Sequence, residues 1–182
     1  MKSILYKKYQ EKSIPTLREK FGYKNVNSVP RIEKVSVNVG INARNSESNY
    51  AENVEKILVR ITGQKPVRTN ARKAISAFKI REGMVVGVKA TIRGQRMYDF
   101  LDKMVNIAIP RIRDFRGLNI KNIDKQGNLT LGIKEHNVFP EIKSDEVERI
   151  YSLEVSITTT AKTYEEGLEL FKSLGFPFQK ID

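Results

Sequence analysis

The stretch Arg60–Arg96, RITGQKPVRTNARKAISAFKIREGMVVGVKATIRGQR, carries most of what the sequence says about the fold and the partner of this chain. It holds ten Lys or Arg residues against one acid, Glu82, so its net charge is +9 in a chain whose total is +12. Apolar residues are interleaved with the basic ones, which indicates that the charges are displayed on folded backbone. Charge concentrated in this way is typical of proteins that bind a polyanion, and nucleic acid is the first interpretation.

Short strands are the local structure that the basic stretch predicts. We expect them at about 66–69, 74–80 and 85–93, where apolar residues alternate with polar ones. Arg81-Glu82-Gly83-Met84 is the expected turn between the last two strands. A turn at this place would put Lys79 and Arg81 on an exposed loop.

The residues just before the basic stretch predict one strand and one helix. Alternating apolar residues indicate a strand over 31–40. Apolar residues at helical spacing then indicate a helix over about 49–62, which Ser46 or Ser48 could cap and which Gly63 could end.

The region after the basic stretch alternates between helix and strand in the same way. Apolar residues at helical or strand spacing and turn residues between them give the boundaries. The expected elements are a helix over about 94–109 that Pro110 ends or bends, a polar loop over 111–127, strands at about 128–134 and 153–160, and a helix capped by Thr163 and Glu166 that ends at Gly175. Helices mixed with mostly antiparallel strands make an α+β fold, and 182 residues suit a single domain.

Composition excludes several classes of function. The chain has no Cys and a single His, His136, so thiolate metal sites and a Ser/His/Asp triad lack their parts. The N-terminal region predicts a helix over about 3–21, interrupted at Pro15 and stopped by Gly22, and it lacks the apolar run of a signal peptide. No apolar run approaches about 18 residues, so no membrane span is expected. We therefore expect an intracellular protein that is not an enzyme and needs no cofactor.

The C-terminal part has the opposite charge. Residues 135–182 hold ten acids and five bases, a net of −5. A protein partner with a basic face is one interpretation, and acids such as Glu165 and Glu166 that solvate a helix and favour its N-terminus are the other.

Several motifs in one order resemble a known family over about residues 5–180. They are Thr62-Gly63-Gln64-Lys65-Pro66, Ala71-Arg72-Lys73, Phe78-Lys79-Ile80-Arg81-Glu82-Gly83, Thr91-Ile92-Arg93-Gly94, Pro110 to Gly117, Phe139-Pro140-Glu141-Ile142, Thr158-Thr159-Thr160-Ala161 and Phe176-Pro177-Phe178. The chain resembles the bacterial form of large ribosomal subunit protein five, the family that binds 5S ribosomal RNA. The resemblance implies an antiparallel sheet with helices packed mainly on one face. It also implies a place in the central protuberance of the large subunit, in a cytoplasmic ribosome or, alternatively, an organellar one.

The partners that the resemblance implies are 5S rRNA, 23S rRNA, the P-site tRNA, a small-subunit head ribosomal protein and neighbouring large-subunit proteins. Residues 62–93 would face RNA. The resemblance and the charges together give the expected 5S rRNA-binding residues, which are Asn38, Gly40, Gln64, Lys65, Arg68, Arg72, Lys73, Lys89, Thr91 and Arg93. Amides and hydroxyls in this set suit ribose hydroxyls and base edges, and the bases suit phosphates.

Two further sets of residues follow from the resemblance alone. The expected contacts to the P-site tRNA are Phe78, Lys79, Ile80, Arg81, Gly83 and Met84. The expected inter-subunit bridge uses Arg111, Arg113, Arg116, Asn137, Glu141 and Lys143. For the bridge arginines, pairing with Asp114 and with helix ends is an equal alternative.

The sequence departs from the family pattern at three places. Asn70 stands where the family usually has a base, Ile41-Asn42-Ala43 replaces a second Gly and an acid, and His136-Asn137 follows Glu135 where Gln is common. Two other classes of function stay open at this point, an RNA-processing enzyme and an adaptor for acidic membranes. The first would need clustered carboxylates or a second catalytic group near His136, and the acids of this chain are dispersed.

Overall fold

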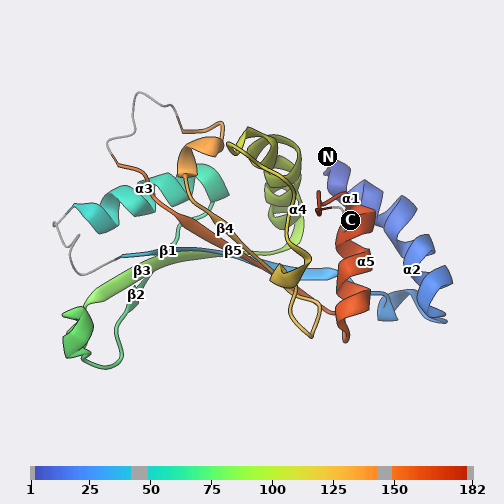
Figure 1. Ribbon diagram of the computed structural model, residues 1–182, viewed down its shortest axis with the longest axis horizontal. Coiled ribbons are helices and arrows are strands. Elements are labelled where there is room, and N and C mark those ends of the chain that lie inside the picture. The colour runs from blue at the N-terminus through green and yellow to red at the C-terminus, as the bar shows by residue number, and fades with distance from the viewer. Residues whose placement is uncertain (1–2, 42–48, 143–148, 180–182) are drawn as a thin grey trace. The chain divides into compact units, whose positions relative to one another are not determined.

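The computed structural model describes residues 3–41, 49–142 and 149–179, and Figure 1 shows the arrangement of its elements. The strands are β1 (Ile32–Gly40), β2 (Val67–Asn70), β3 (Val85–Ile92), β4 (Leu129–Ile133) and β5 (Leu153–Thr159), and the α-helices are α1 (Ile4–Lys8), α2 (Ile14–Phe21), α3 (Tyr50–Thr62), α4 (Gly94–Lys103) and α5 (Tyr164–Leu174). The strands form one antiparallel sheet in the order β2-β3-β1-β5-β4. The expected α+β fold is confirmed.

The chain divides into two compact units. The first consists of Met1–Val35, Arg93–Leu131 and Ser156–Asp182, and the second of Ser36–Ile92 and Gly132–Val155. Strands β1, β4 and β5 each contribute residues to both units. The basic residues of the stretch from 60 to 92 belong to the second unit.

Burial alternates along β1, β4 and β5. In β1, Val35, Val37 and Val39 are buried, while Ser36 and Asn38 between them are half-buried. The pattern repeats in β5, where residues of one parity are buried and those of the other are not. Since successive side chains of a strand point to opposite faces, one face of the sheet is covered and the other is open. This agrees with the expectation of helices packed mainly on one face.

Helix α3 covers the sheet within the second unit. Val54, Leu58 and Ile61 are at most 1% exposed, and they repeat at helical spacing along one side of α3. The helix ends where Gly63 adopts φ 67°, a left-handed conformation that glycine reaches without steric cost. The expected end of this helix is confirmed, whereas Ser46 and Ser48 lie outside the described residues.

The β2–β3 hairpin differs from the sequence-based expectation in its connection. The expected strand over 74–80 is wrong, because the segment forms a 3-10 turn at Ser76–Phe78 with a single bridge between Ile75 and Ile80. Ile75 and Phe78 are 46% and 68% exposed, so the apolar alternation has no covered face against which a strand could pack. Local hydrogen bonds prevail instead, such as the bond from the Lys79 N–H to the Ser76 carbonyl (3.0 Å). The turn at 81–84 is confirmed by the bond from the Met84 N–H to the Arg81 carbonyl (3.2 Å).

The first unit holds the other helices. The expected N-terminal helix is present, with a π-helical segment, Tyr9–Ser13, between α1 and α2 and with Gly22 at its end. Helix α4 likewise continues into a π-helical segment, Met104–Ala108, and a 3-10 turn at Ile109–Arg111 that contains the expected proline. The polar region expected as a loop over 111–127 is a loop apart from a 3-10 turn at Ile120–Asn122.

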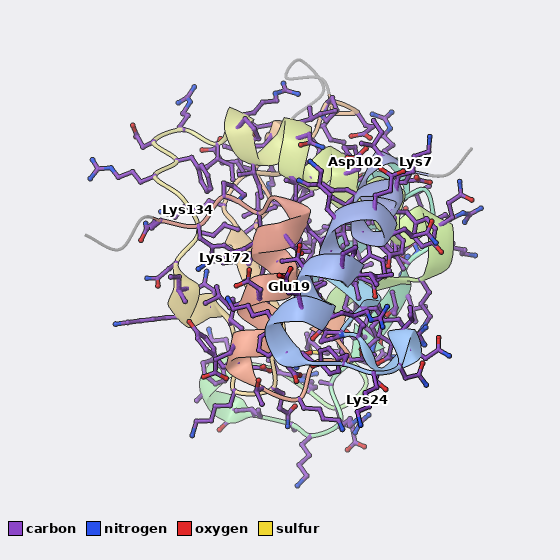
Figure 2. The ribbon with its side chains drawn as sticks, turned by 90° about the vertical axis from the view of Figure 1, so that its right-hand side faces the viewer. Lys7, Glu19, Lys24, Asp102, Lys134 and Lys172 are labelled. Atoms are coloured by element: carbon purple, nitrogen blue, oxygen red, sulfur yellow. The ribbon has the colours of Figure 1, made fainter. Side chains whose placement is uncertain are left out.

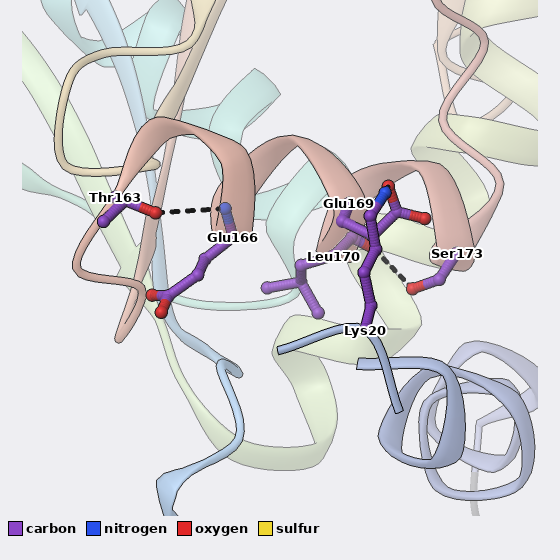
Figure 3. Close-up of polar contacts among 6 residues, drawn as sticks. All are labelled: Lys20, Thr163, Glu166, Glu169, Leu170 and Ser173. Carbon is purple, nitrogen blue, oxygen red and sulfur yellow. Dashed lines mark hydrogen bonds and ion pairs between the residues drawn. The ribbon is translucent and has the colours of Figure 1, made fainter. Parts of the chain in front are cut away.

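Helix α5 is fixed at its N-terminus by the expected cap. The Thr163 hydroxyl accepts a hydrogen bond from the Glu166 N–H (3.4 Å), as Figure 3 shows. The Glu166 carboxylate accepts from the Lys162 N–H (2.7 Å), one residue earlier than in a standard capping box. Lys20 of α2 forms an ion pair with Glu169 over 2.5 Å, and Figure 2 shows α5 beside the N-terminal helices.

Candidate RNA-binding surface

The register of the β2–β3 hairpin decides which side chains share a face. Thr69 lies opposite Gly87 and Val67 lies opposite Lys89, so these residues point to one side. Arg68 lies opposite the fully buried Val88 and pairs with Glu55 of α3, so it points to the covered side. We call the other side, with Asn38, Thr69, Lys89 and Thr91 on β1, β2 and β3, the open face.

Gln64 lies beside Thr91, in the turn after α3. Its Nε2 donates a hydrogen bond to the backbone carbonyl of Thr91 over 2.9 Å. The Thr62 hydroxyl accepts from the Gln64 N–H (3.3 Å) and donates to the Leu58 carbonyl (2.6 Å), which fixes the start of the turn on the last turn of α3. The structure thus brings two residues that are 27 positions apart in the sequence to one place, and both were expected to bind RNA.

Asn38 lies on the same face. It is half-buried on β1, and its side-chain oxygen lies near Gly87 of the neighbouring strand β3. Gly40, at the end of β1, is exposed. Among the described residues, the side chains of Asn38, Thr69 and Thr91 make no hydrogen bond within the protein. Polar groups on a strand face that are not used by the fold are available to a ligand.

The basic residues fall into two groups. Lys65, Arg72, Lys73 and Lys89 are exposed and form no ion pair within the described part of the chain. Arg68 and Arg93 are instead paired with carboxylates, the latter with Glu33 over 3.4 Å. The hydrogen bond from Arg68 is the main cause that lowers the pKa of Glu55. The two paired arginines are therefore less available to phosphate than the four lysines and arginines that are not paired.

The expected tRNA contacts lie at the far end of the β2–β3 hairpin (Figure 1). Two hydrogen bonds close the loop where it leaves the strands, from the Ala71 N–H to the Met84 carbonyl (2.8 Å) and from the Gly83 N–H to the Ala71 carbonyl (3.0 Å). Lys79 adopts φ 55°, which is uncommon for a residue other than glycine. Phe78, Lys79 and Arg81 are all exposed there, while Ile80 and Met84 are half-buried.

The expected bridge residues are not brought into one unit. Arg111, Arg113 and Arg116 are exposed residues of the first unit. Asn137 and Glu141 belong to the second unit and are half-buried. Lys143 lies outside the described residues.

His136 has a structural environment. It is 1% exposed, its Nδ1 accepts a hydrogen bond from the Tyr151 N–H (3.2 Å), and its ring meets that of Tyr151 edge to face. Burial lowers its pKa. Within the described ranges, no three His, Asp or Glu side chains gather in a way that could hold a metal ion, and no helix is long and apolar enough to cross a bilayer.

Sequence reasoning missed Thr69, Gly87 and Val67 as parts of the open face. Alternation within β2 indicated that Val67 and Thr69 share a side, but two sides of an exposed strand look alike in sequence. Only the pairing with Gly87 and Lys89 decides which side is open.

Comparison with known proteins identifies the kind of protein. Residues 25–81 match the family model described as ribosomal protein L5, and residues 85–178 match the model described as the ribosomal L5P family C-terminus. The chain is 49% identical to the large ribosomal subunit protein uL5 of Halothermothrix orenii over 98% of its own length and 99% of that protein. It is 52% identical to the protein of the same name from Synechocystis sp., over 94% and 95% of the two chains.

These matches show that the chain is a structural, non-enzymatic protein of the ribosome. The chain belongs to the ribosomal protein L5 family. It is accordingly a structural constituent of the large ribosomal subunit, and ribosomes that contain such a protein work in the cytoplasm.

Proposed function

We propose that this chain binds 5S ribosomal RNA through the open face and anchors it in the central protuberance of the large subunit. The observation that carries the proposal is the hydrogen bond from Gln64 to the Thr91 carbonyl, with Asn38 on the same face of the sheet as the Thr91 side chain. The family resemblance assigns all three residues to RNA contacts, and they come from three separate segments of the sequence. Asn38 and Thr91 share the open face and Gln64 contacts the Thr91 backbone, beside the exposed bases of the basic stretch, and such a grouping is what an RNA site requires.

The chemistry of the open face suits RNA rather than a simple polyanion. Asn38 and Gln64 carry amides that both donate and accept, and Thr91 carries a hydroxyl. Such groups match ribose 2′-hydroxyls and exposed base edges, which are the features that an A-form helix and its loops present. Lys65, Arg72, Lys73 and Lys89 supply charge for phosphates, so binding should weaken steeply with salt. Arg68 and Arg93 contribute less in this account, because protein carboxylates already hold them.

The loop from Phe78 to Met84 is proposed as the contact to the P-site tRNA. The exposed ring of Phe78 can stack on a base or sugar, and Lys79 and Arg81 can meet phosphates. This loop lies beyond Asn70 and Val85, the last pair of the β2–β3 ladder, so it can be altered without replacing Asn38 or Gln64.

The remaining partners are proposed from the family resemblance. They are 23S rRNA, neighbouring large-subunit proteins and a small-subunit head protein, the last reached through the segments around Arg111–Gly117 and Asn137–Ile142. The chain would act as one RNA-binding domain, with residues 62–93 facing RNA and the acidic part from 135 onward available to basic proteins.

Reconstitution tests the anchoring role. Large subunits are assembled from purified components with and without this protein, and the 5S rRNA retained after sedimentation is measured. The proposal predicts that 5S rRNA is retained only with the protein. Equal retention in its absence would contradict the anchoring role.

A further inference from the structure

Gly87 lies at the centre of the open face with no side chain of its own, and two neighbouring side chains close over it. A Cβ atom built on Gly87 would lie 2.9 Å from Thr69 Oγ1 and 3.6 Å from Asn38 Oδ1. It would also lie 3.1 Å from the Val39 carbonyl oxygen, so the backbone of β1 is close as well. Thr69 approaches from β2 and Asn38 from β1, which are the two neighbours of β3 in the sheet.

The nearest atoms to the space above Gly87 are therefore oxygen atoms of Thr69, Val39 and Asn38 rather than apolar side chains. A methyl group at this position would meet the Thr69 hydroxyl at a distance that real Cβ atoms do not adopt, so a larger residue would force that hydroxyl to move. Within the described residues, neither the Thr69 hydroxyl nor the Asn38 amide forms a hydrogen bond in the protein. The fold keeps both groups in place around Gly87 without using their hydrogen-bonding capacity, which is an arrangement that favours a ligand.

We propose that Thr69 is a further RNA-recognition residue, which reads a ribose 2′-hydroxyl together with Asn38, and that Gly87 is the positioning residue that leaves room for both. The inference rests on the proposed binding of 5S rRNA and extends it to a side chain outside the family-based set. A hydroxyl beside an amide offers a donor and an acceptor to one ribose hydroxyl. Lys89, two residues along β3 on the same face, supplies the charge for the adjoining phosphate.

Thr69→Val is the variant that tests this inference, because valine keeps the β-branched shape and removes only the hydroxyl. Loss of one hydrogen bond should weaken 5S rRNA binding about three- to tenfold in a filter-binding titration. Thr69→Ser restores a hydroxyl and should recover most of the affinity. Thr130→Val, the same exchange at an exposed position of β4, at the other end of the strand order, should leave the affinity unchanged.

Interference mapping separates recognition from a merely structural role. 5S rRNA carrying random 2′-deoxy substitutions is bound to the wild-type protein and to Thr69→Val, and the positions depleted from the bound fraction are compared. The inference predicts at least one position where the missing 2′-hydroxyl impairs binding to the wild type and not to the variant. Gly87→Ala, checked for folding by its thermal midpoint, should lose the same interference signal.

The outcomes are distinguishable. Wild-type protein that does not prefer 5S rRNA over a decoy would contradict the proposed function itself. Wild-type preference combined with an unchanged affinity and an unchanged interference pattern in Thr69→Val would overturn only the role of Thr69. A Thr69→Ser variant as weak as Thr69→Val would overturn the hydroxyl argument.

Discussion

Gln64 and Thr91 are joined by a hydrogen bond from the Gln64 Nε2 to the Thr91 backbone carbonyl over 2.9 Å. Because the acceptor is backbone, replacing the Thr91 side chain leaves this bond intact, whereas replacing Gln64 removes it. Gln64→Ala should therefore weaken 5S rRNA binding more than Thr91→Ala, by about tenfold against about threefold. It removes the proposed RNA contact of Gln64 and also the hydrogen bond that holds the turn against Thr91. A filter-binding titration measures the difference, and the exposed Gln126→Ala serves as control. Wild-type affinity in Gln64→Ala would contradict the placement of the site.

The side chains of Lys89 and Arg68 point to opposite faces of the sheet, although both residues lie on the β2–β3 hairpin. Lys89 is exposed on the open face, and Arg68 is paired with Glu55 on the covered side. Lys89→Ala should lower the slope of log affinity against log salt by about one, as the loss of one phosphate contact does. Arg68→Ala should leave that slope nearly unchanged. An equal loss of slope in both variants would show that Arg68 leaves Glu55 to bind RNA.

The loop of Lys79 and Arg81 should act separately from the 5S site. Replacing both with Ala should spare 5S rRNA binding and reduce peptidyl-tRNA occupancy in reconstituted ribosomes. The double change Lys121→Ala and Lys125→Ala removes the same charge from an exposed loop and should affect neither measurement. Parallel loss of both activities in the loop variant would show that the loop belongs to the 5S site.

Gly127 and Gly167 meet backbone to backbone in the first unit. A Cβ on Gly167 would lie 2.4 Å from the Gly127 Cα and 2.5 Å from its carbonyl oxygen, so Gly167→Ala must separate the start of α5 from that turn. We expect a loss of about 3 kcal/mol in the free energy of unfolding, within the range for overpacked sites. Urea denaturation measures it, and Gly132→Ala, where nothing lies within 4 Å, should change little. Equal stability of the two variants would contradict the close contact.

His136 should make the stability of the protein depend on pH. Burial lowers its pKa below the unfolded value of about 6.5, so the unfolded chain binds a proton more readily than the folded one. Its contribution is therefore fully present above pH of about 6.5 and is lost as the pH falls below that value. His136→Gln should flatten the fall in urea midpoint between about pH 7.5 and 5.5, relative to the wild type. Identical pH dependence in the two proteins would contradict this account.

Much of the fold could be predicted from sequence where local signals agreed with tertiary packing. The helix that ends at Gly63 and the helix capped by Thr163 each had a helical period and a terminal residue, and the structure has them there. Strand β1 had alternating apolar residues that end at Gly40, and it also lies where expected. The segment 74–80 had the alternating pattern of a strand, but most of its apolar side chains are exposed. Sequence spacing could not show this, because burial depends on residues far away in the sequence. For the same reason, the strand register that places Thr69 opposite Gly87, and so on the open face, could not be obtained from composition or spacing.

The candidate site was predictable in part. Charge located the basic stretch, and the family resemblance named Asn38, Gln64 and Thr91. The fold places Asn38 and Thr91 on the open face and Gln64 against the Thr91 backbone. Ion pairs such as Arg68 with Glu55 join residues 13 positions apart on different elements, so sequence alone could not separate the paired arginines from the available ones. The role of Gly87 depends on the closeness of two neighbouring strands, which no local pattern encodes.

The most direct test of the central claim is a gel-shift titration of the purified protein with 5S rRNA and with an unrelated folded RNA of equal length, at low and at near-physiological salt. The account predicts that affinity for both RNAs falls with salt, and that a clear preference for 5S rRNA persists at the higher concentration. Equal affinity for the two RNAs at near-physiological salt would contradict it.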